Sequence, residues 1–510
     1  MSFVGEQLAG DTVGAATWHR LDPRMLLIHP IVEVGRALPA LAGVFLAGSS
    51  QGHNYWGLLA TGVVAAASLT RWFTTRLRIT PESVQLRHGL LHRRTITTAR
   101  DRIRTVDLTA HPLHRLLGLA RVVIGTGTND RKGEGRLVLD GLTVSAAGAL
   151  RDDLLHNREV RAPTAVGPAA QQVAHEATQE LVRLDRQWIR YAPFTLSGVV
   201  TGLVIWGFYW RVQGESGVDV TRYGPLRSIA HALHALPTAA EVLVVVAAVG
   251  LFVAITSTAG YLLAFWNFRL ARHPGGSLQV TRGLLTTRAT SIERRRLVGV
   301  TTSASLPLRA VGAARVSAVA TGLRTGRGSE RGGEVLLPPA PRAVAESVAG
   351  QVLDGATGVT TALRPHGPAA RRRRLLRAML GGAVLCAAFV AGWLAGAPIG
   401  LLVLGGGLLA CSVPLGLDRY RSLGHDVVGR WLVTGWGSLI RQRVVLDGHA
   451  VIGWNLRSTW FQRRAGLVTL VATTAAGRQG YPVPDVGADE AIAVADAVTP
   501  GLLDPFRAAR

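Results

Sequence analysis

The sequence predicts an α+β membrane protein with six transmembrane helices in three hairpins, each followed by a cytoplasmic small β-barrel or sandwich capped by a C-terminal helix. Three observations support this fold class: long apolar blocks in pairs, arginines beside them, and a soluble module that recurs three times. Of the 510 residues, 48% are hydrophobic and only 17% are charged, although the net charge is +24. A disordered basic protein is excluded, because such chains contain few apolar residues.

The apolar blocks define three helical hairpins. They cover roughly residues 34–48 and 55–73, 192–210 and 240–265, and 378–396 and 399–417. A bilayer core about 30 Å thick needs about 20 apolar residues in a helix, and each block approaches that length. The first block is the weakest, since it is short and contains Arg36 and Pro39. Residues 1–20 lack a basic region followed by an apolar core, so we expect no cleavable signal peptide.

Arginines flank the outer ends of the hairpins. They are Arg20, Arg24 and Arg36 before the first, Arg71, Arg76 and Arg78 after it, Arg183, Arg186 and Arg190 before the second, Arg269 and Arg272 after it, Arg371, Arg372, Arg373, Arg374 and Arg377 before the third, and Arg419 and Arg421 after it. The loops inside the first and third hairpins contain no Arg or Lys, and loop 211–239 is nearly neutral. The positive-inside rule therefore predicts a multi-pass protein of the cytoplasmic membrane with both termini cytoplasmic.

The regions that follow the hairpins are copies of one another. Residues 87–122 align without a gap with residues 281–316 at an offset of 194, and a further offset of 154 leads to residues 435–470. The first two copies share Gly89/Gly283, Leu90/Leu284, Leu91/Leu285, Arg94/Arg288, Arg100/Arg294, Arg115/Arg309, Gly118/Gly312, Arg121/Arg315 and Val122/Val316, and the third keeps Gly437, Leu439, Arg463 and Gly466. A hairpin followed by a soluble module therefore occurs three times.

Each module is predicted to be mainly β structure. Short runs of Val, Ile, Leu and Thr alternate with polar turns, and His88-Gly89 and Arg282-Gly283 are typical of tight strand turns. A glycine-rich loop follows in each copy, at 129–136, 324–334 and 477–480, and then a helix-like stretch at 145–159, 341–355 and 488–500. Closing the strands into a small barrel plugged by this helix would hide the strand edges.

These features predict nine consecutive segments. They are an N-terminal cytoplasmic segment (1–30), hairpin one (31–73), module one (74–160), a linker with an amphipathic helix (161–190), hairpin two (191–266), module two (267–356), a basic linker (357–377), hairpin three (378–418) and module three (419–510).

A short motif recurs in the modules. It is Pro112-Leu113-His114-Arg115-Leu116-Leu117-Gly118 with Val122 in module one and Leu306-Pro307-Leu308-Arg309-Ala310-Val311-Gly312 with Val316 in module two. In module three it is Trp460-Phe461-Gln462-Arg463-Arg464-Ala465-Gly466, which lacks the Pro-Leu. With the hairpin-then-module architecture, this motif resembles the bacterial pleckstrin-homology-like (PH-like) membrane proteins of the YdbT type. The resemblance implies a PH-like fold for each module, and roles in envelope stress or in resistance to membrane-active peptides.

Patterns that carry chemistry are absent from the sequence. It contains no GxxxxGK[ST], HExxH, GxSxG or DxDxDG stretch. His111 and His114 have no counterparts in the other modules, and Cys386 and Cys411 lie in apolar stretches typical of structural thiols. We therefore expect no catalytic residues, no metal site, no cofactor and no enzyme activity.

Two sets of arginines are candidate site residues. Arg115, Arg309 and Arg463 recur at one motif position, where an arginine either pins a loop through carbonyl or carboxylate groups or binds a phosphate or a partner's carboxylate. Arg371, Arg372, Arg373 and Arg374 precede hairpin three, where such a run serves either as a topology signal or as a contact for anionic lipid. The two roles of this second set are compatible.

The sequence favours a non-enzymatic platform for binding and assembly at the cytoplasmic membrane. The expected partners are membrane lipids and either further copies of the chain or a smaller PH-like membrane protein. The alternative is a component of a transport or export system for peptides or other small molecules, which rests on the helix count. Nucleic-acid binding, suggested by the charge of +24, is disfavoured and we expect none, because much of the excess arginine lies beside apolar segments and no nucleic-acid-binding motif occurs.

Overall fold

The structure, a computed structural model, describes most of the chain beyond residue 72. The described residues are 73–89, 93–103, 105–125, 136–156, 179–195, 197–216, 235–273, 276–321 and 334–502, with parts of 18–33 and 59–70 and residues 228 and 232. The predicted first membrane hairpin, 31–73, lies almost entirely outside them. The chain divides into two compact units, one of residues 1–180, 267–296 and 322–324, the other of residues 181–266, 297–321 and 325–510. Module two is therefore shared between the units.

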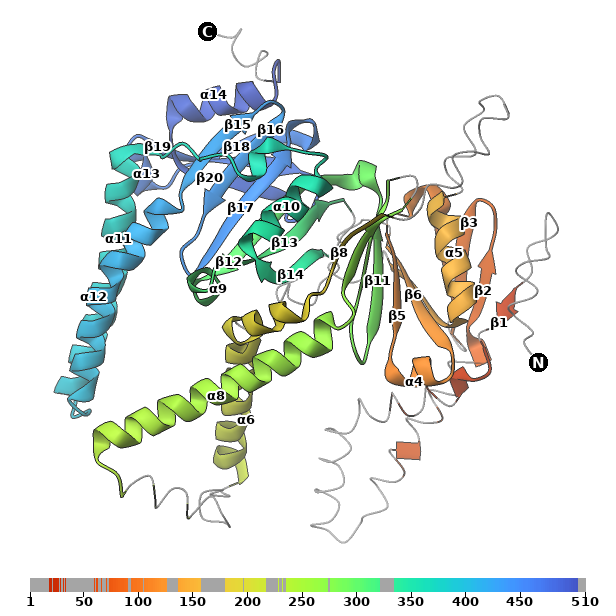
Figure 1. Cartoon of the computed structure of the whole chain (residues 1–510), viewed down its shortest axis with the longest axis horizontal. Helices are drawn as coiled ribbons and strands as arrows, with labels where there is room; N and C mark the ends of the chain where they lie inside the picture. Colours follow the sequence, from red (N-terminus) through yellow and green to blue (C-terminus); the bar gives the residue numbers. More distant parts are fainter. Residues whose placement is uncertain are drawn as a thin grey trace. The chain divides into compact units, whose positions relative to one another are not determined.

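Module one is a β-sandwich closed by a helix (Figure 1). Its elements are β1 (His19–Arg20), β2 (Arg76–Ile79), β3 (Ser83–His88) and β4 (Arg94–Ala99) in one sheet, β5 (Thr105–Ala110), β6 (Leu119–Gly125) and β7 (Arg136–Thr143) in another, and α5 (Val144–His156). Leu86 of the first sheet, Val122 of the second and Ala147 of the helix share one buried core. The strands therefore form a sandwich because their alternate apolar side chains need two facing surfaces to leave water.

Module three repeats this plan in the second unit. Its elements are β15 (Gly424–Val428), β16 (Trp431–Trp436), β17 (Ile440–Asp447), β18 (Val451–Arg457), β19 (Leu467–Thr474), β20 (Gly480–Gly487) and α14 (Ala488–Val498). Ala491, Val494, Ala495 and Val498 form the buried face of α14 at helical spacing. The predicted strand turns recur with glycine at positive φ, 108° at Gly89, 113° at Gly283 and 99° at Gly437. Glycine adopts this conformation without steric cost.

The remaining strands join successive modules edge to edge. Module two consists of β9 (Arg269–Arg272), β10 (Leu278–Arg282), β11 (Thr287–Ile292), β12 (Leu297–Ser305), β13 (Ala313–Ala320), β14 (Val335–Pro341) and α10 (Arg342–Val352). In the first unit β11 pairs antiparallel with β5 of module one, within a seven-stranded sheet that also contains β8 (Gln179–Arg183). In the second unit β12 pairs antiparallel with β17 of module three, within a six-stranded sheet.

This pairing corrects the expectation that each module closes its own barrel. The edges of β5, β11, β12 and β17 are covered by the neighbouring module instead. An edge strand presents unpaired N–H and C=O groups, and a tandem copy of the module supplies a strand that satisfies them.

Three described helices are long and apolar enough to cross a membrane. They are α8 (Thr238–Phe265), α11 (Gly367–Leu394) and α12 (Gly400–Arg421). The prediction of six transmembrane helices is therefore not supported beyond these three. The predicted third segment is helical as α6 (Ser197–Ser216), but its last turns contain Arg211 and Glu215, which lower its hydropathy. Hairpin one falls almost entirely on residues outside the described set.

Helices α11 and α12 form a close antiparallel hairpin. A Cβ at Gly382 would lie 2.8 Å from Cβ of Ser412, and one at Gly416 would lie 3.1 Å from Cβ of Ala378. Small residues let membrane helices approach closely. Close packing matters in lipid because no hydrophobic driving force holds one helix against another. Helix α11 begins at Gly367, so the second half of the predicted linker 357–377 is helical and continuous with the membrane span.

Candidate functional site

The repeated motif builds the same turn in each module. It forms the short helices α4 (Pro112–Leu116), α9 (Leu306–Ala310) and α13 (Trp460–Arg464). Proline in the first turn of α4 and α9 costs no helical hydrogen bond, and α13 has a capping box between Thr459 and Gln462 instead. Gly118, Gly312 and Gly466 follow with φ of 69°, 70° and 64°, the left-handed region that ends a helix. The motif arginine thus lies in the last turn of each helix.

In the first unit, Arg115 binds the strand turn of the following module. Its Nη1 donates a hydrogen bond to the carbonyl oxygen of Leu284 at 2.7 Å. Leu284 lies in the turn between β10 and β11. Beside it, the Thr286 hydroxyl and His111 Nδ1 are 3.2 Å apart. Module one is therefore fastened to the β10–β11 turn by side chains as well as by the β5–β11 ladder.

In the second unit, Arg309 makes the equivalent contact. Its Nη1 donates to the carbonyl oxygen of Ser438 at 2.9 Å. Ser438 occupies in module three the position of Leu284 in module two, because the two are separated by the repeat offset of 154. We call these two contacts, Arg115 to Leu284 and Arg309 to Ser438, the arginine clamps. At both junctions, Nη1 of the motif arginine therefore donates to the carbonyl oxygen at the equivalent turn position of the next module.

The second clamp also reaches the membrane hairpin. Arg309 donates to both carboxylate oxygens of Asp418, near the end of α12, at 2.9 Å and 2.6 Å. Arg441 of β17 donates to the same carboxylate at 3.0 Å. The hydrogen bond with Asp418 raises the pKa of Arg309, whereas burial and then the charge of Arg309 lower the pKa of Arg441. Planar guanidinium and carboxylate groups fit each other in this forked geometry.

Arg463, the third motif arginine, is placed differently. It is exposed, and no hydrogen bond or ion pair joins its side chain to another residue in the described part of the chain. Trp460 and Phe461 on the same helix are 54% and 67% exposed. The structure therefore brings Arg115 and Arg309 into module junctions and leaves Arg463 on the surface of module three.

The basic run before hairpin three serves a buried carboxylate. Arg373 Nη1 and Arg374 Nε both bind Asp485, the latter at 2.5 Å, and Gln462 donates to the same carboxylate at 2.8 Å. The Asp485 side chain is fully buried and the Arg374 side chain only 9% exposed. The predicted lipid contact therefore does not fit Arg373 and Arg374, which bind module three to α11. Arg371 and Arg372 are exposed.

A buried histidine pair lies next to this ion pair. His366 Nε2 and His425 Nδ1 are 2.8 Å apart, and His366 Nδ1 donates to the carbonyl of Pro484 at 2.9 Å. Burial, followed by the neighbouring His425, lowers the pKa of His366 to about 4. Burial and Arg364 also lower the pKa of His425. Neutral rings are favoured, since one ring nitrogen must accept the hydrogen bond between them.

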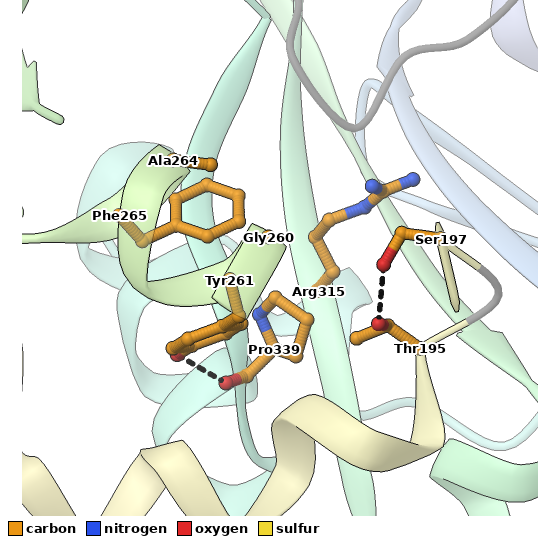
Figure 2. A pocket seen from close by; sticks show the side chains of 8 residues that line it. All are labelled: Thr195, Ser197, Gly260, Tyr261, Ala264, Phe265, Arg315 and Pro339. Carbon is orange, nitrogen blue, oxygen red and sulfur yellow. Dashed lines mark hydrogen bonds between the residues drawn. The ribbon is translucent and has the colours of Figure 1, made fainter. Parts of the chain in front are cut away.

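A small cavity lies where α8 meets module two (Figure 2). Its volume is about 30 Å³, and Tyr261 donates to the Pro339 carbonyl at 3.1 Å while the Thr195 and Ser197 hydroxyls are 2.8 Å apart. Ligand pockets usually measure about 300–1,000 Å³, so this cavity suits at most an ordered water. Over the described ranges, no group of three His, Cys, Asp or Glu side chains is arranged to hold a metal ion.

Sequence reasoning found the arginines but missed their partners. Asp418 and Asp485 are the carboxylates that the arginines bind, and both were unremarked in the sequence. The detectable signal for Asp418 is an acidic residue at the end of an apolar block, next to Arg419. Asp485 offers none, because only folding places it against α11.

Comparison with known proteins agrees with this architecture. The bacterial PH domain family matches residues 30–158 and 379–500, which contain the first and third modules with the hairpins before them. The UPF0699 transmembrane protein YdbT of Bacillus subtilis (strain 168) is 22% identical over 308 residues, which are 58% of this chain and 60% of the relative. The match thus spans about three fifths of the relative's length. No solved structure matches the chain significantly.

The family match covers modules one and three. Module two, which it does not cover, carries the same motif and the same short helix. The relative is a transmembrane protein, and the described part of this chain contains three helices long and apolar enough to cross a membrane. The chain is therefore a membrane protein in which two segments match the bacterial PH domain family, and it is similar to the YdbT transmembrane protein.

Proposed function

We propose that the chain is a non-enzymatic assembly platform of the cytoplasmic membrane, with its termini and modules on the cytoplasmic side. The observation that carries the proposal is the way in which the modules are joined. Continuous sheets and arginine clamps connect successive modules, and Arg309 also binds the carboxylate of Asp418 at the end of α12. Within each unit, such joints fasten one module to part of the next, which suits a surface that binds partners.

The surface of the platform carries groups suited to protein and lipid partners. Arg371 and Arg372 are exposed in the first turns of α11, next to the membrane span. Each basic side chain near an anionic membrane surface contributes about 1 kcal/mol. We therefore assign lipid contact to these two arginines rather than to the whole basic run.

Partner capture tests the platform. The full chain, purified from native membranes in mild detergent, is compared with an Arg309→Ala variant, whose module junction is weakened. We expect specific membrane or cytoplasmic proteins in the first sample and fewer in the second. A sample that holds neither partner proteins nor anionic lipid would refute the proposal.

A growth assay tests the physiological setting. The resemblance to the YdbT type supports a proposed role of the platform in envelope stress or in resistance to membrane-active peptides. A deletion strain is therefore expected to be more sensitive to such peptides, and the full chain to restore resistance. Equal survival of the deletion and complemented strains would refute this role. It would not affect the partner-capture test of the platform.

A further inference from the structure

Two strands lie at open sheet edges where the repeat elsewhere has a paired strand. β4 ends one sheet and β18 begins another, and neither has a second neighbour among the described strands. Their counterparts are all paired: β11 and β17 correspond to β4, whereas β5 and β12 correspond to β18. An open edge exposes N–H and C=O groups that a further strand can bind.

The two observed junctions imply one register for the missing pair. The corresponding pairs are Leu108 opposite Ala289 in the first junction and Thr302 opposite Arg443 in the second. Shifted by the repeat offsets of 194 and 154, both place Thr95 of β4 opposite Leu456 of β18. A slip by a single residue would turn every side chain to the other face, so this agreement is informative.

The side chains on these two edge strands are exposed, as expected of an interface that forms only between two chains. Ile452 and Leu456 of β18 are 65% and 49% exposed, and Thr95 of β4 is exposed. Next to β18, Arg463 occupies the clamp position without a partner in the described residues. At both observed junctions the arginine of this position binds a turn carbonyl of the module that supplies the neighbouring strand.

We propose that β18 of one chain pairs antiparallel with β4 of a second copy, with Thr95 opposite Leu456 and with Arg463 as a third clamp. We take a second copy as the occupant because β4 and β18 of one chain lie in different sheets, and the register of the observed junctions matches β18 to the edge of β4. The inference rests on the proposed platform and names its partner. Modules of successive chains would then continue the same series of joined sheets.

Cysteine cross-linking between two differently tagged chains tests this pairing. The native Cys386 and Cys411 are replaced by alanine, and Thr95→Cys and Leu456→Cys are placed in separate chains that are co-expressed. Opposed residues of antiparallel strands lie within disulfide reach. We expect oxidation of isolated membranes by copper phenanthroline to give a mixed disulfide of the two tagged chains.

Matched variants guard against chance contact. Asn455→Cys, one residue from Leu456 on the other strand face, is expected to cross-link at least fivefold less. Arg463→Ala is expected to reduce the mixed disulfide, whereas Arg464→Ala leaves it unchanged. The mixed disulfide is also measured with the purified chains alone. Its absence there would count against the pairing of β4 with β18, whether or not the chain captures partner proteins.

Three outcomes would overturn the proposal. One is no mixed disulfide from chains that elute as the parent does on size exclusion. Another is a disulfide that joins two Thr95→Cys chains, or two Leu456→Cys chains, as efficiently as it joins one chain of each kind. The third is capture of a different protein by Leu456→Cys in place of a second copy.

Discussion

Replacing Arg309 by alanine is expected to loosen the junction between modules two and three. The substitution removes two hydrogen bonds to Asp418 and one to the Ser438 carbonyl. A hydrogen bond to a charged group contributes about 1.5–3 kcal/mol, but both side chains of the ion pair are 22% exposed, so solvent screens part of it. The remaining Arg441 also keeps Asp418 partly compensated. We therefore expect the free energy that stabilises the junction between modules two and three to fall by about 2 kcal/mol.

Hydrogen–deuterium exchange of the full chain in detergent measures this loss at the junction. Because 2 kcal/mol is a factor of about 30 in an equilibrium constant, amides of the β12–β17 ladder should exchange roughly 30-fold faster. Asp418→Ala should have a similar effect, and the double variant should lose less than the sum of the two. Arg115→Ala, at the other junction, serves as the control and should leave this ladder unchanged.

The reasoning is refuted if exchange in the β12–β17 ladder changes by less than about threefold in Arg309→Ala, since that is under about 1 kcal/mol. It is equally refuted if exchange rises over the whole second unit, because the clamp would then support the fold of the modules rather than their junction.

Three further predictions concern the hairpin and module three. Asp485→Ala should lower stability by about 3–5 kcal/mol, because it leaves two buried or half-buried arginines unpaired; an unchanged melting temperature would contradict this. Stability should fall as pH is lowered from about 6.5 towards 4, because the pKa of His366 is lower in the folded state than in the unfolded chain; His366→Gln/His425→Gln should flatten this melting-temperature profile, and an identical slope would count against the pair. Gly382→Val should separate α11 from α12 and increase protease cleavage of the hairpin, whereas Gly381→Val, which meets no atom within 4 Å, should not.

Periodicity and composition carry the local architecture. Apolar length predicts α8, α11 and α12, glycine at 89 and 283 predicts two strand turns, and an amphipathic pattern predicts α14. These features depend on residues close together in the chain, so a single sequence expresses them. The internal repeat extends the prediction from one module to three.

Partners that are distant in sequence are not predictable in the same way. Arg374 and Asp485 are 111 residues apart, and Arg309 and Asp418 are 109 apart. Neither pair shows a spacing signal, because a salt bridge depends on where two surfaces meet. The sequence therefore predicted a lipid contact for Arg371–Arg374, whereas in the folded chain Arg373 and Arg374 bind the buried carboxylate of Asp485.

The sequence by itself determined that this chain has apolar spans, three copies of one module and a recurrent arginine. Only the tertiary structure decided that the strand edges of one module are covered by the next, and that the arginine holds a turn in that neighbour. The physical reason is that a hydrophobic pattern specifies which face of a strand is buried, whereas any antiparallel strand can satisfy its edge. The choice between closing a module and joining two modules is therefore made by tertiary geometry.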